Sequence, residues 1–526
     1  MSQPMHLVSA PLSRPRFARA GGLLARAAVA TACVAAVLPA QVPVNTATST
    51  PALVITRVQV VDVGTGEVRS DQTLVMANGR IVDVGPRTRV KSPRGARVVD
   101  GTGLYAVPGL WDMHVHTSAV AMKPARPGER KDVAHNAAFV FPLFVANGVT
   151  GIRDMSGNLS LLNSWRAEIR AGRMVGPRML ITGAKLGSEN PVVPGAPYPI
   201  STDEDVRTSV RLLKEHGADL VKYLELPLDR TRFLLRVARE QGMPVAGHVP
   251  AWMRVADVSD AGMTSVEHLQ GVLQGVTPLE DELIAETLHE FTWWGKLLQR
   301  AGLWDVERRF EDRRRRALES ANDSTTQALF RRFIRNGTWQ VPTLSFVRHM
   351  NGVMDPKADR DARAAYMLPF LTGLRSSWGE GDTLLALDYV KWAHRVTGQM
   401  ARAGVPLLAG SDMPGSLRLP GFSLVDELEH LVSAGLTPLQ SLQAATIRPA
   451  DFLHARDSLG TLEQGKVADV ILVRGNPLAD IRQLRKLESV VLAGRYLSRS
   501  DLDQMLAQVR ATVADWRSSV PPKREP

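Results

Sequence analysis

The chain has 526 residues, which at roughly 150 residues per domain is enough for up to three domains. Its 44% hydrophobic and 22% charged residues are typical of soluble globular proteins, and a chain of this size can bury a core without disulfides. These values exclude a disulfide-stabilised miniprotein, a disordered tail and a collagen-like fibre. The net charge is +11, but the first 44 residues hold four arginines and no acid, so the rest of the chain carries only +7. Such a small surplus predicts no nucleic-acid partner.

The N-terminal segment has the composition of a secretory signal. Four arginines come before an Ala/Val-rich run over 27–37, which is followed by small residues up to Ala40. We therefore predict a signal peptide over 1–40 and an exported protein, periplasmic or secreted. The only cysteine, Cys33, lies in this segment, so the mature protein would have no thiol chemistry. No other stretch reaches the length of a membrane-spanning helix, and we expect no stable membrane span in the mature protein.

Both ends of the remaining chain have the texture of small β-structure. Residues 53–105 contain short β-type runs with tight turns, among them the hairpin signal Asn78-Gly79. Residues 456–500 show the same pattern, so the two pieces are predicted to form one small discontinuous β-sandwich. A C-terminal helix and tail are expected over 501–526.

The middle of the chain, 106–455, alternates between strands and helices. Its apolar strand-like segments are 105–115, 149–153, 179–182, 219–223, 244–247, 264–267, 339–344 and 406–410. Strands that alternate with helices form parallel sheets, and eight of them predict a (β/α)8 barrel. An Arg/Trp-rich helical insertion is expected at about 275–338, with the arginine run 313–316 on a solvated helix face.

Several potential metal ligands lie at the ends of these strands. His114 and His116 are two residues apart at the end of one strand, so both side chains point to the same face and could bind one ion. His248, His268 and Asp412 end three later strands. The carboxyl ends of barrel strands meet at one mouth, which would bring these five side chains together. Imidazole and carboxylate ligands suit zinc or a similar divalent ion, although each residue alone could equally be structural.

Lys222 ends the fourth predicted strand. Burial near other cations would lower the pKa of its amine, and a neutral amine can add carbon dioxide. The resulting carbamate is an anion that could bridge two metal ions. The alternative is an ordinary ion pair with Asp219 or Glu225, and the spacing by itself leaves both possibilities open.

The motifs over about 53–500 resemble those of the amidohydrolase superfamily, in its imidazolonepropionase-like and Xaa-Pro dipeptidase-like branch. The matching segments are VPGLWDMHVH at 107–116, GVTGIRD at 148–154, VAGHVP at 245–250, SVEHL at 265–269, AGSD at 409–412, AGLTP at 434–438 and GKVAD at 465–469. The motifs are specific to the superfamily and do not identify a substrate.

This resemblance implies a centre of two divalent metal ions, with zinc as the expected metal. Its six ligand positions, called the ligand cluster below, are His114, His116 and Asp412 for the first ion, His248 and His268 for the second, and a carboxylated Lys222 as the bridge. The resemblance further implies that a hydroxide between the ions attacks a carbonyl carbon, while Asp412 acts as catalytic residue by shuttling the proton to the leaving nitrogen.

The expected activity is hydrolysis of a C–N amide bond in a small molecule, a dipeptide or an N-acyl amino acid by resemblance alone. Two alternatives stay open: a mononuclear or binuclear hydrolase of a cyclic amide or lactone, and a non-catalytic ligand-binding barrel. A homo-oligomer is expected. Arg153, Tyr223 and His430 are weak candidates for substrate contacts. Arg153 could instead pair with a barrel carboxylate, and strand alternation points Tyr223 away from the metals. Relatives often have a histidine where this chain has Val425, so any substrate contact that this histidine makes in relatives is in doubt for this chain.

Overall fold

The computed structural model describes residues 51–118, 133–187, 198–300, 305–353, 361–367, 382–415 and 417–519. The predicted signal peptide and Cys33 lie outside these residues. The fold below is that of the compact unit that spans Val44–Pro526.

Strands from the two ends of the chain form one mixed sheet, which confirms that the two ends share a sheet. Its strands are β1 (Leu53–Val61), β2 (Val68–Ala77), β3 (Arg80–Pro86), β4 (Arg97–Asp100), β5 (Tyr105–Pro108), β15 (Val470–Val473), β16 (Leu487–Leu492) and β17 (Arg495–Leu497). The order is β17-β16-β15-β5-β1-β2-β3, and β4 pairs with β1. The two ends of the chain meet where β5 and β15 pair antiparallel, with Val470 opposite Pro108.

One apolar cluster of this sheet contains residues from both ends of the chain. Asn78 and Gly79 both have positive φ, 51° and 73°, as the tight β2–β3 hairpin requires. A bridge between Arg80 and Val467 then connects β3 to the residues just before β15. Ile55 and Leu472 are both buried in this cluster, where side chains from the two ends of the chain pack together. Where the sequence predicted a small β-sandwich, the structure thus shows strands that hydrogen bonds join into one mixed sheet.

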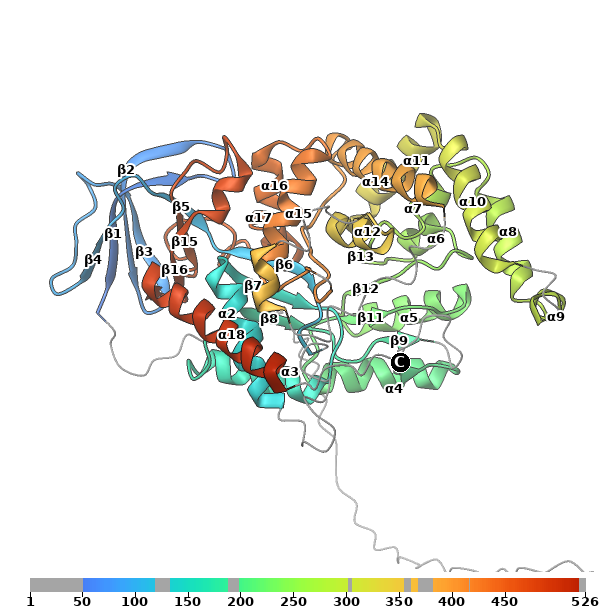
Figure 1. Cartoon of the computed structure of the whole chain (residues 1–526), viewed down its shortest axis with the longest axis horizontal. Coiled ribbons are helices and arrows are strands. Elements are labelled where there is room, and N and C mark those ends of the chain that lie inside the picture. Colours follow the sequence, from blue (N-terminus) through green and yellow to red (C-terminus); the bar gives the residue numbers. More distant parts are fainter. Residues whose placement is uncertain are drawn as a thin grey trace, which may run out of the picture. The chain divides into compact units, whose positions relative to one another are not determined.

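Two parallel sheets form the centre of the molecule (Figure 1). One has the order β6-β7-β8 and the other β10-β9-β11-β12-β13-β14. The strands are β6 (Leu110–Val115), β7 (Val149–Asp154), β8 (Arg178–Ile181), β9 (Leu186–Gly187), β10 (Tyr198–Pro199), β11 (Val221–Tyr223), β12 (Val245–Gly247), β13 (Ser265–Glu267) and β14 (Trp339–Val341). The chain is therefore an α/β protein with a parallel core and a mixed terminal sheet.

Backbone hydrogen bonds connect the two parallel sheets at both edges. Asp219 donates its N–H to the carbonyl of Ile181 at 2.8 Å, between β8 and β11. At the other edge the predicted strand 406–410 fills the gap: Leu408 donates to Gln340 at 3.0 Å, and Met113 donates to Ala409 at 2.9 Å. The sequence of strand-to-strand contacts therefore returns from β14 to β6.

Helices follow most of the parallel strands and cover them. They are α2 (Val133–Ala146), α3 (Leu159–Arg170), α4 (Asp203–Glu215), α5 (Leu228–Glu240), α6 (Val255–Asp260), α7 (Val272–Gly275), α8 (Glu280–Glu290), α9 (Trp293–Arg300), α10 (Val306–Ser320), α11 (Asp323–Asn336), α12 (Leu344–Met350), α14 (Thr383–Ala403), α15 (Phe422–Ser433), α16 (Pro438–Ala444), α17 (Ile447–Phe452) and α18 (Arg499–Ser519), with 3-10 turns at Ala362–Tyr366 and Ile481–Arg485. Helix α4 illustrates why these segments form helices. Thr202 and Asp205 form a capping box at its start, and Val206 and Val210 face the core. Among the described residues, no helix combines the length and apolar composition that a membrane crossing needs.

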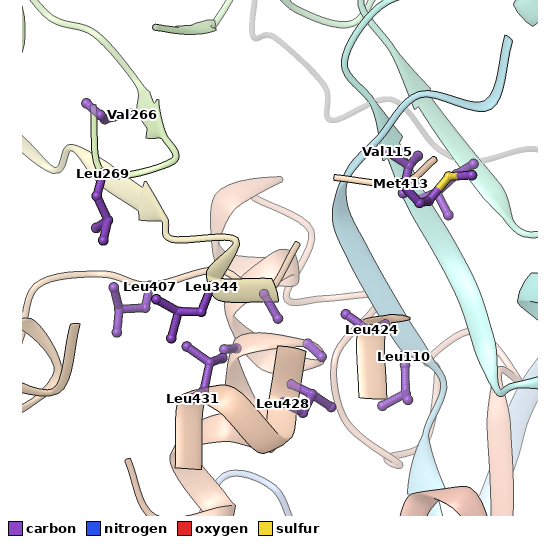
Figure 2. Packing of buried hydrophobic residues seen from close by; sticks show 14 of the residues in the cluster. Leu110, Val115, Val266, Leu269, Leu344, Leu407, Met413, Leu424, Leu428 and Leu431 are labelled. Carbon is purple, nitrogen blue, oxygen red and sulfur yellow. The ribbon is translucent and has the colours of Figure 1, made fainter. Parts of the chain in front are cut away.

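Buried leucines hold the last part of the parallel core in place. Figure 2 shows Leu407 and Leu344 beside Leu428 and Leu431, the latter two on α15. Leu344, Leu428 and Leu431 are fully buried. This packing positions the segment 406–410, and Asp412 lies just after that segment.

The described part of the interval 275–338 forms helices α8 to α11, as expected. The prediction that the arginine run 313–316 is solvated is wrong for Arg313 and Arg314. Arg313 is buried and pairs with Glu290 at 2.6 Å, and the Arg314 guanidinium lies 3.7 Å from the centre of the Tyr389 ring. The reason is that α10 packs between α8 and α14, so one side of the run faces protein.

Candidate metal centre

Each member of the ligand cluster lies at the carboxyl end of a parallel strand. His114 is in β6, His116 follows it, and Asp412 follows the segment 406–410. Lys222 lies in β11, and His248 and His268 come directly after β12 and β13. Ring contacts join the histidines in a chain, with centroid distances of 5.2 Å for His114–His116, 4.6 Å for His114–His268 and 5.1 Å for His248–His268. The structure therefore brings the predicted strand ends together.

Three of these residues form a compact candidate metal site. The Nε2 atoms of His114 and His116 lie 3.3 Å and 3.1 Å from the same oxygen, Oδ1 of Asp412. Ligand atoms of the three side chains lie within 4.8 Å of one another. A backbone hydrogen bond of 2.7 Å from Asp412 N to the His114 carbonyl keeps the two segments in register.

Outer partners orient three of the imidazoles in the same way. His114 Nδ1 lies 2.6 Å from Oε2 of Glu267, His116 Nδ1 lies 2.7 Å from the hydroxyl of Ser156, and His268 Nδ1 lies 2.7 Å from that of Thr343. In each ring this leaves Nε2 as the atom available for a ligand. Metal-binding histidines have this arrangement, since the second nitrogen fixes the tautomer.

The protonation state of His114 shows that the site fits a cation. Burial lowers the pKa of His114 to about 4, so the ring is neutral near pH 7. Its Nδ1 must carry the proton, because the neighbouring Glu267 carboxylate can only accept. His114 Nε2 therefore has a lone pair that faces the Asp412 carboxylate, and it has no hydrogen-bond partner in the described chain. A shared divalent ion would satisfy both acceptors.

Electrostatics prepare the remaining ligands for metal binding as well. Burial lowers the pKa of His248 and of His268 well below the ordinary histidine value, so both are neutral. Burial alone would raise the pKa of Asp412, but its interactions with the surrounding His114, His268 and His116 side chains hold it well below the ordinary carboxyl value. Neutral imidazoles and an ionised carboxylate bind metal without first losing a proton.

Lys222 is buried with no hydrogen-bond partner for its Nζ among the described residues. Burial lowers the pKa of this amine to about 8. The predicted alternative was an ion pair with Asp219 or Glu225, but Nζ is hydrogen-bonded to neither of them, and Asp219 accepts from Arg166 at 2.7 Å. An unpartnered amine of lowered pKa beside the histidines is compatible with a carbamate bridge.

Two members of the ligand cluster and one neighbouring residue have left-handed backbone conformations without being glycine. Asp412, His268 and Thr343 have φ values of 49°, 61° and 46°. Such conformations are costly for residues with a Cβ and gather at functional sites, where the surrounding fold enforces them. Here they aim side chains from two strand ends toward the same point.

The three weak candidates for substrate contacts lie elsewhere. Arg153 is fully buried and donates to Glu267 at 2.9 Å, which favours the alternative of a pair with a barrel carboxylate. Tyr223 is fully buried and donates to the sulfur of Met263 at 3.7 Å, on the side away from the metals that strand alternation predicts. His430 lies on α15 and contacts His394 at 5.5 Å between ring centres. No contact joins His430 to the ligand cluster in the described part of the chain.

With this geometry established, the comparison with known families is decisive. The model of the Amidohydrolase family matches residues 395–497, which include Asp412 and the strands β15 and β16. This match agrees with the resemblance of the sequence motifs to the amidohydrolase superfamily. The enzyme class expected from the sequence, a metal-dependent hydrolase of carbon–nitrogen bonds, is the class of this superfamily.

Individual amidohydrolases resemble the chain to different extents. Ochratoxinase of Aspergillus niger is 23% identical over 487 residues, which cover 81% of this chain and 82% of that protein. Adenine deaminase of Desulforamulus reducens is 32% identical over 139 residues, but this match spans only 23% of that protein and 26% of this chain. A solved Xaa-Pro dipeptidase with methionine bound in its active site has the same fold, with a TM-score of 0.60 at 21% identity, and the match covers 85% of this chain and all of that one.

Sequence reasoning missed several residues of this candidate site. Glu267 precedes His268 in the SVEHL motif at 265–269, but the motif does not show that its carboxylate contacts His114. Thr343 carried no comparable signal. Neither did Arg418, whose Nη1 lies 3.3 Å from Oδ2 of Asp412. These two residues become neighbours of the site only through the folding of loops.

Proposed function

We propose that the chain hydrolyses a C–N amide bond in a dipeptide or N-acyl amino acid with a binuclear metal centre. The observation that carries this proposal is the group at the strand ends: the neutral His114, His248 and His268, an ionised Asp412, and Lys222, whose Nζ has no hydrogen-bond partner among the described residues. The names of the relatives support the substrate class, since one is a Xaa-Pro dipeptidase.

In the proposed centre, His114, His116 and Asp412 would hold one ion, His248 and His268 would hold the second, and a carboxylated Lys222 would be a ligand shared by both. Zinc is the proposed metal, because imidazole nitrogens and carboxylate oxygens are common zinc ligands. When bound, such ions supply a water of lowered pKa and polarise the substrate carbonyl.

The chain's own residues then manage the proton. Oδ1 of Asp412 faces the Nε2 atoms of His114 and His116. Its Oδ2 is therefore the atom proposed to accept a proton and return it to the leaving nitrogen. Arg418 holds this oxygen with Nη1 at 3.3 Å and fixes the orientation of the carboxylate. Its guanidinium also lies 4.8 Å from the centre of the Phe346 ring.

We also propose that the parallel core is the (β/α)8 barrel expected for such enzymes. The hydrogen bonds of Asp219, Leu408 and Met113 support closure, because they connect the two sheets at both edges. The proposed place of action is outside the cytoplasm, on the grounds of the composition of residues 1–40. Fractionation of cells that express the full chain, with and without this segment, would test it.

The decisive experiment is elemental analysis of the purified protein after reconstitution with zinc and bicarbonate, for wild type, Lys222→Ala and Lys466→Ala. Lys466 is a matched control, since it is also buried but its Nζ donates to the carbonyl of Arg456, in the turn region after α17. We expect about two ions per chain in wild type and the control, as a bridged binuclear site requires, and a clear loss in Lys222→Ala.

The same preparations should be tested on a panel of dipeptides and N-acetyl amino acids, with cyclic amides and lactones included. One ion per chain in all three proteins would eliminate the bridging role of Lys222. Hydrolysis of cyclic compounds alone would replace the proposed substrate class. A metal-loaded protein that hydrolyses none of them would favour the non-catalytic alternative.

A further inference from the structure

Lys185 lies opposite Lys222 at the mouth of the parallel core. It comes directly before β9, in which Leu186 pairs in parallel with Tyr223 of β11. Lys185 and Lys222 each precede a member of this pair by one residue, so the two lysines are neighbours as well. Leu186 and Tyr223 are both buried in the apolar cluster behind the strands. Because side chains alternate along a strand, both lysines point to the opposite face, where the ligand cluster lies.

The charge of Lys185 is not used by the described chain. Two other cations next to the cluster have carboxylate partners: Arg153 donates to Glu267 at 2.9 Å and Arg418 lies 3.3 Å from Asp412. Lys185 makes no hydrogen bond or ion pair within the described residues, and its side chain is only partly buried. The Asp412 carboxylate acts on its charge, so the ammonium lies within electrostatic reach of the centre.

We propose that Lys185 binds the free carboxylate of the substrate and thereby determines specificity for amides of amino acids. This inference rests on the proposed function and adds the residue that would recognise its substrate class. In a dipeptide or N-acyl amino acid, the carboxylate is attached to the carbon next to the scissile nitrogen. A substrate whose carbonyl lies at the ligand cluster therefore carries its negative charge close by, and an ammonium group can donate several hydrogen bonds to it.

The test compares matched pairs of compounds on the zinc-loaded full chain. Each pair is an N-acetyl-L-amino acid and its C-terminal amide, which keeps the shape but removes the charge. The proteins are wild type, Lys185→Met, Lys185→Arg and the control Lys391→Met, which removes an exposed lysine on α14. We expect kcat/KM of wild type to favour the carboxylate over the amide by roughly tenfold to hundredfold, as for a hydrogen bond to a charged group.

In Lys185→Met this ratio should fall close to one, Lys185→Arg should keep part of it, and Lys391→Met should match wild type. The shift of Tm that each compound causes gives a second readout, which does not depend on turnover. Stabilisation by carboxylates that requires Lys185, without hydrolysis of any compound, would uphold the carboxylate site and eliminate the proposed function.

Four results would overturn the inference. Wild type could show no preference for carboxylates, or Lys185→Met could keep the preference. Loss of bound zinc in Lys185→Met, with both compounds of a pair equally affected, would instead make Lys185 a positioning residue for Lys222. If no compound is hydrolysed and none shifts Tm, the carboxylate site and the proposed function fail together.

Discussion

Nδ1 of His114 lies 2.6 Å from Oε2 of Glu267, and the two side chains are completely buried. The same carboxylate also accepts from Arg153 at 2.9 Å and 3.0 Å. Burial alone would raise the pKa of Glu267, but Arg153 and His114 keep it below the ordinary value, so Glu267 stays ionised. This contact fixes which nitrogen of His114 is free for a metal ion.

Glu267→Gln should lower zinc affinity by roughly 10- to 100-fold, as removal of a partner of a ligating histidine does. The amide keeps the shape of the side chain but can present its NH₂ group to His114, which disfavours the productive tautomer. Competition with a chromophoric chelator measures this affinity. Glu290→Gln is the matched control: it also removes a buried partner of an arginine, Arg313, and should lower stability but leave zinc affinity unchanged.

Arg153→Met should destabilise the protein by roughly 3–5 kcal/mol, because it leaves the Glu267 charge buried without its strongest partner. Urea unfolding measures this free energy, and Arg153→Met combined with Glu267→Gln should cost less than the sum of the two single changes. A raised KM with unchanged stability would instead support a contact between Arg153 and the substrate.

The pH dependence of stability should report the buried Lys222 in the metal-free protein. Burial lowers the pKa of this amine from 10.5 to about 8. Below pH 8 both the folded and the unfolded chain carry the proton, and burial of the charge costs stability. Between about 8 and 10.5 only the unfolded chain binds it, so stability rises with pH across this window. Lys222→Met should therefore have a higher Tm than wild type at pH 7, and the difference should shrink toward pH 10. A difference that does not change with pH would contradict this assignment.

Asp412→Asn should lower kcat by roughly 100- to 10,000-fold, the range for loss of a general acid–base group. Bound zinc has to be measured on the same sample, because Asp412 is also a proposed ligand. Asp426→Asn, on α15 and paired with Arg363 and Arg485, is the control. A loss of zinc in proportion to the loss of kcat would show that ligation alone explains the effect.

Two arginines of one run on α10 should differ strongly in their contribution to stability. Arg313→Met removes the partner of the buried Glu290 and should cost roughly 3 kcal/mol of unfolding free energy. Arg315 pairs with Asp382 at a site where both side chains are more than a third exposed, so Arg315→Met should cost less than about 1 kcal/mol. Urea unfolding of both variants decides, and equal costs would contradict the packing of α10 against α8.

The sequence alone determined which residues could form the cluster. His114 and His116 share one face because a strand repeats every two residues, and strand ends of a parallel core converge whatever their separation along the chain. The same periodicity indicated that Tyr223 points away from the ligands. The pairing of the two chain ends was also readable, since both consist of short β-type runs joined by turn residues.

Only the tertiary structure decided which partner each group meets. The contacts of Glu267 with His114 and of Arg418 with Asp412 join segments with no fixed spacing, and the same packing leaves Lys185 without a partner among the described residues. The arginine run on α10 shows the same limit: its composition predicts a solvated face, but packing against α8 buries Arg313. Periodicity determines the face to which a side chain points, whereas the charge it meets there depends on how distant segments pack.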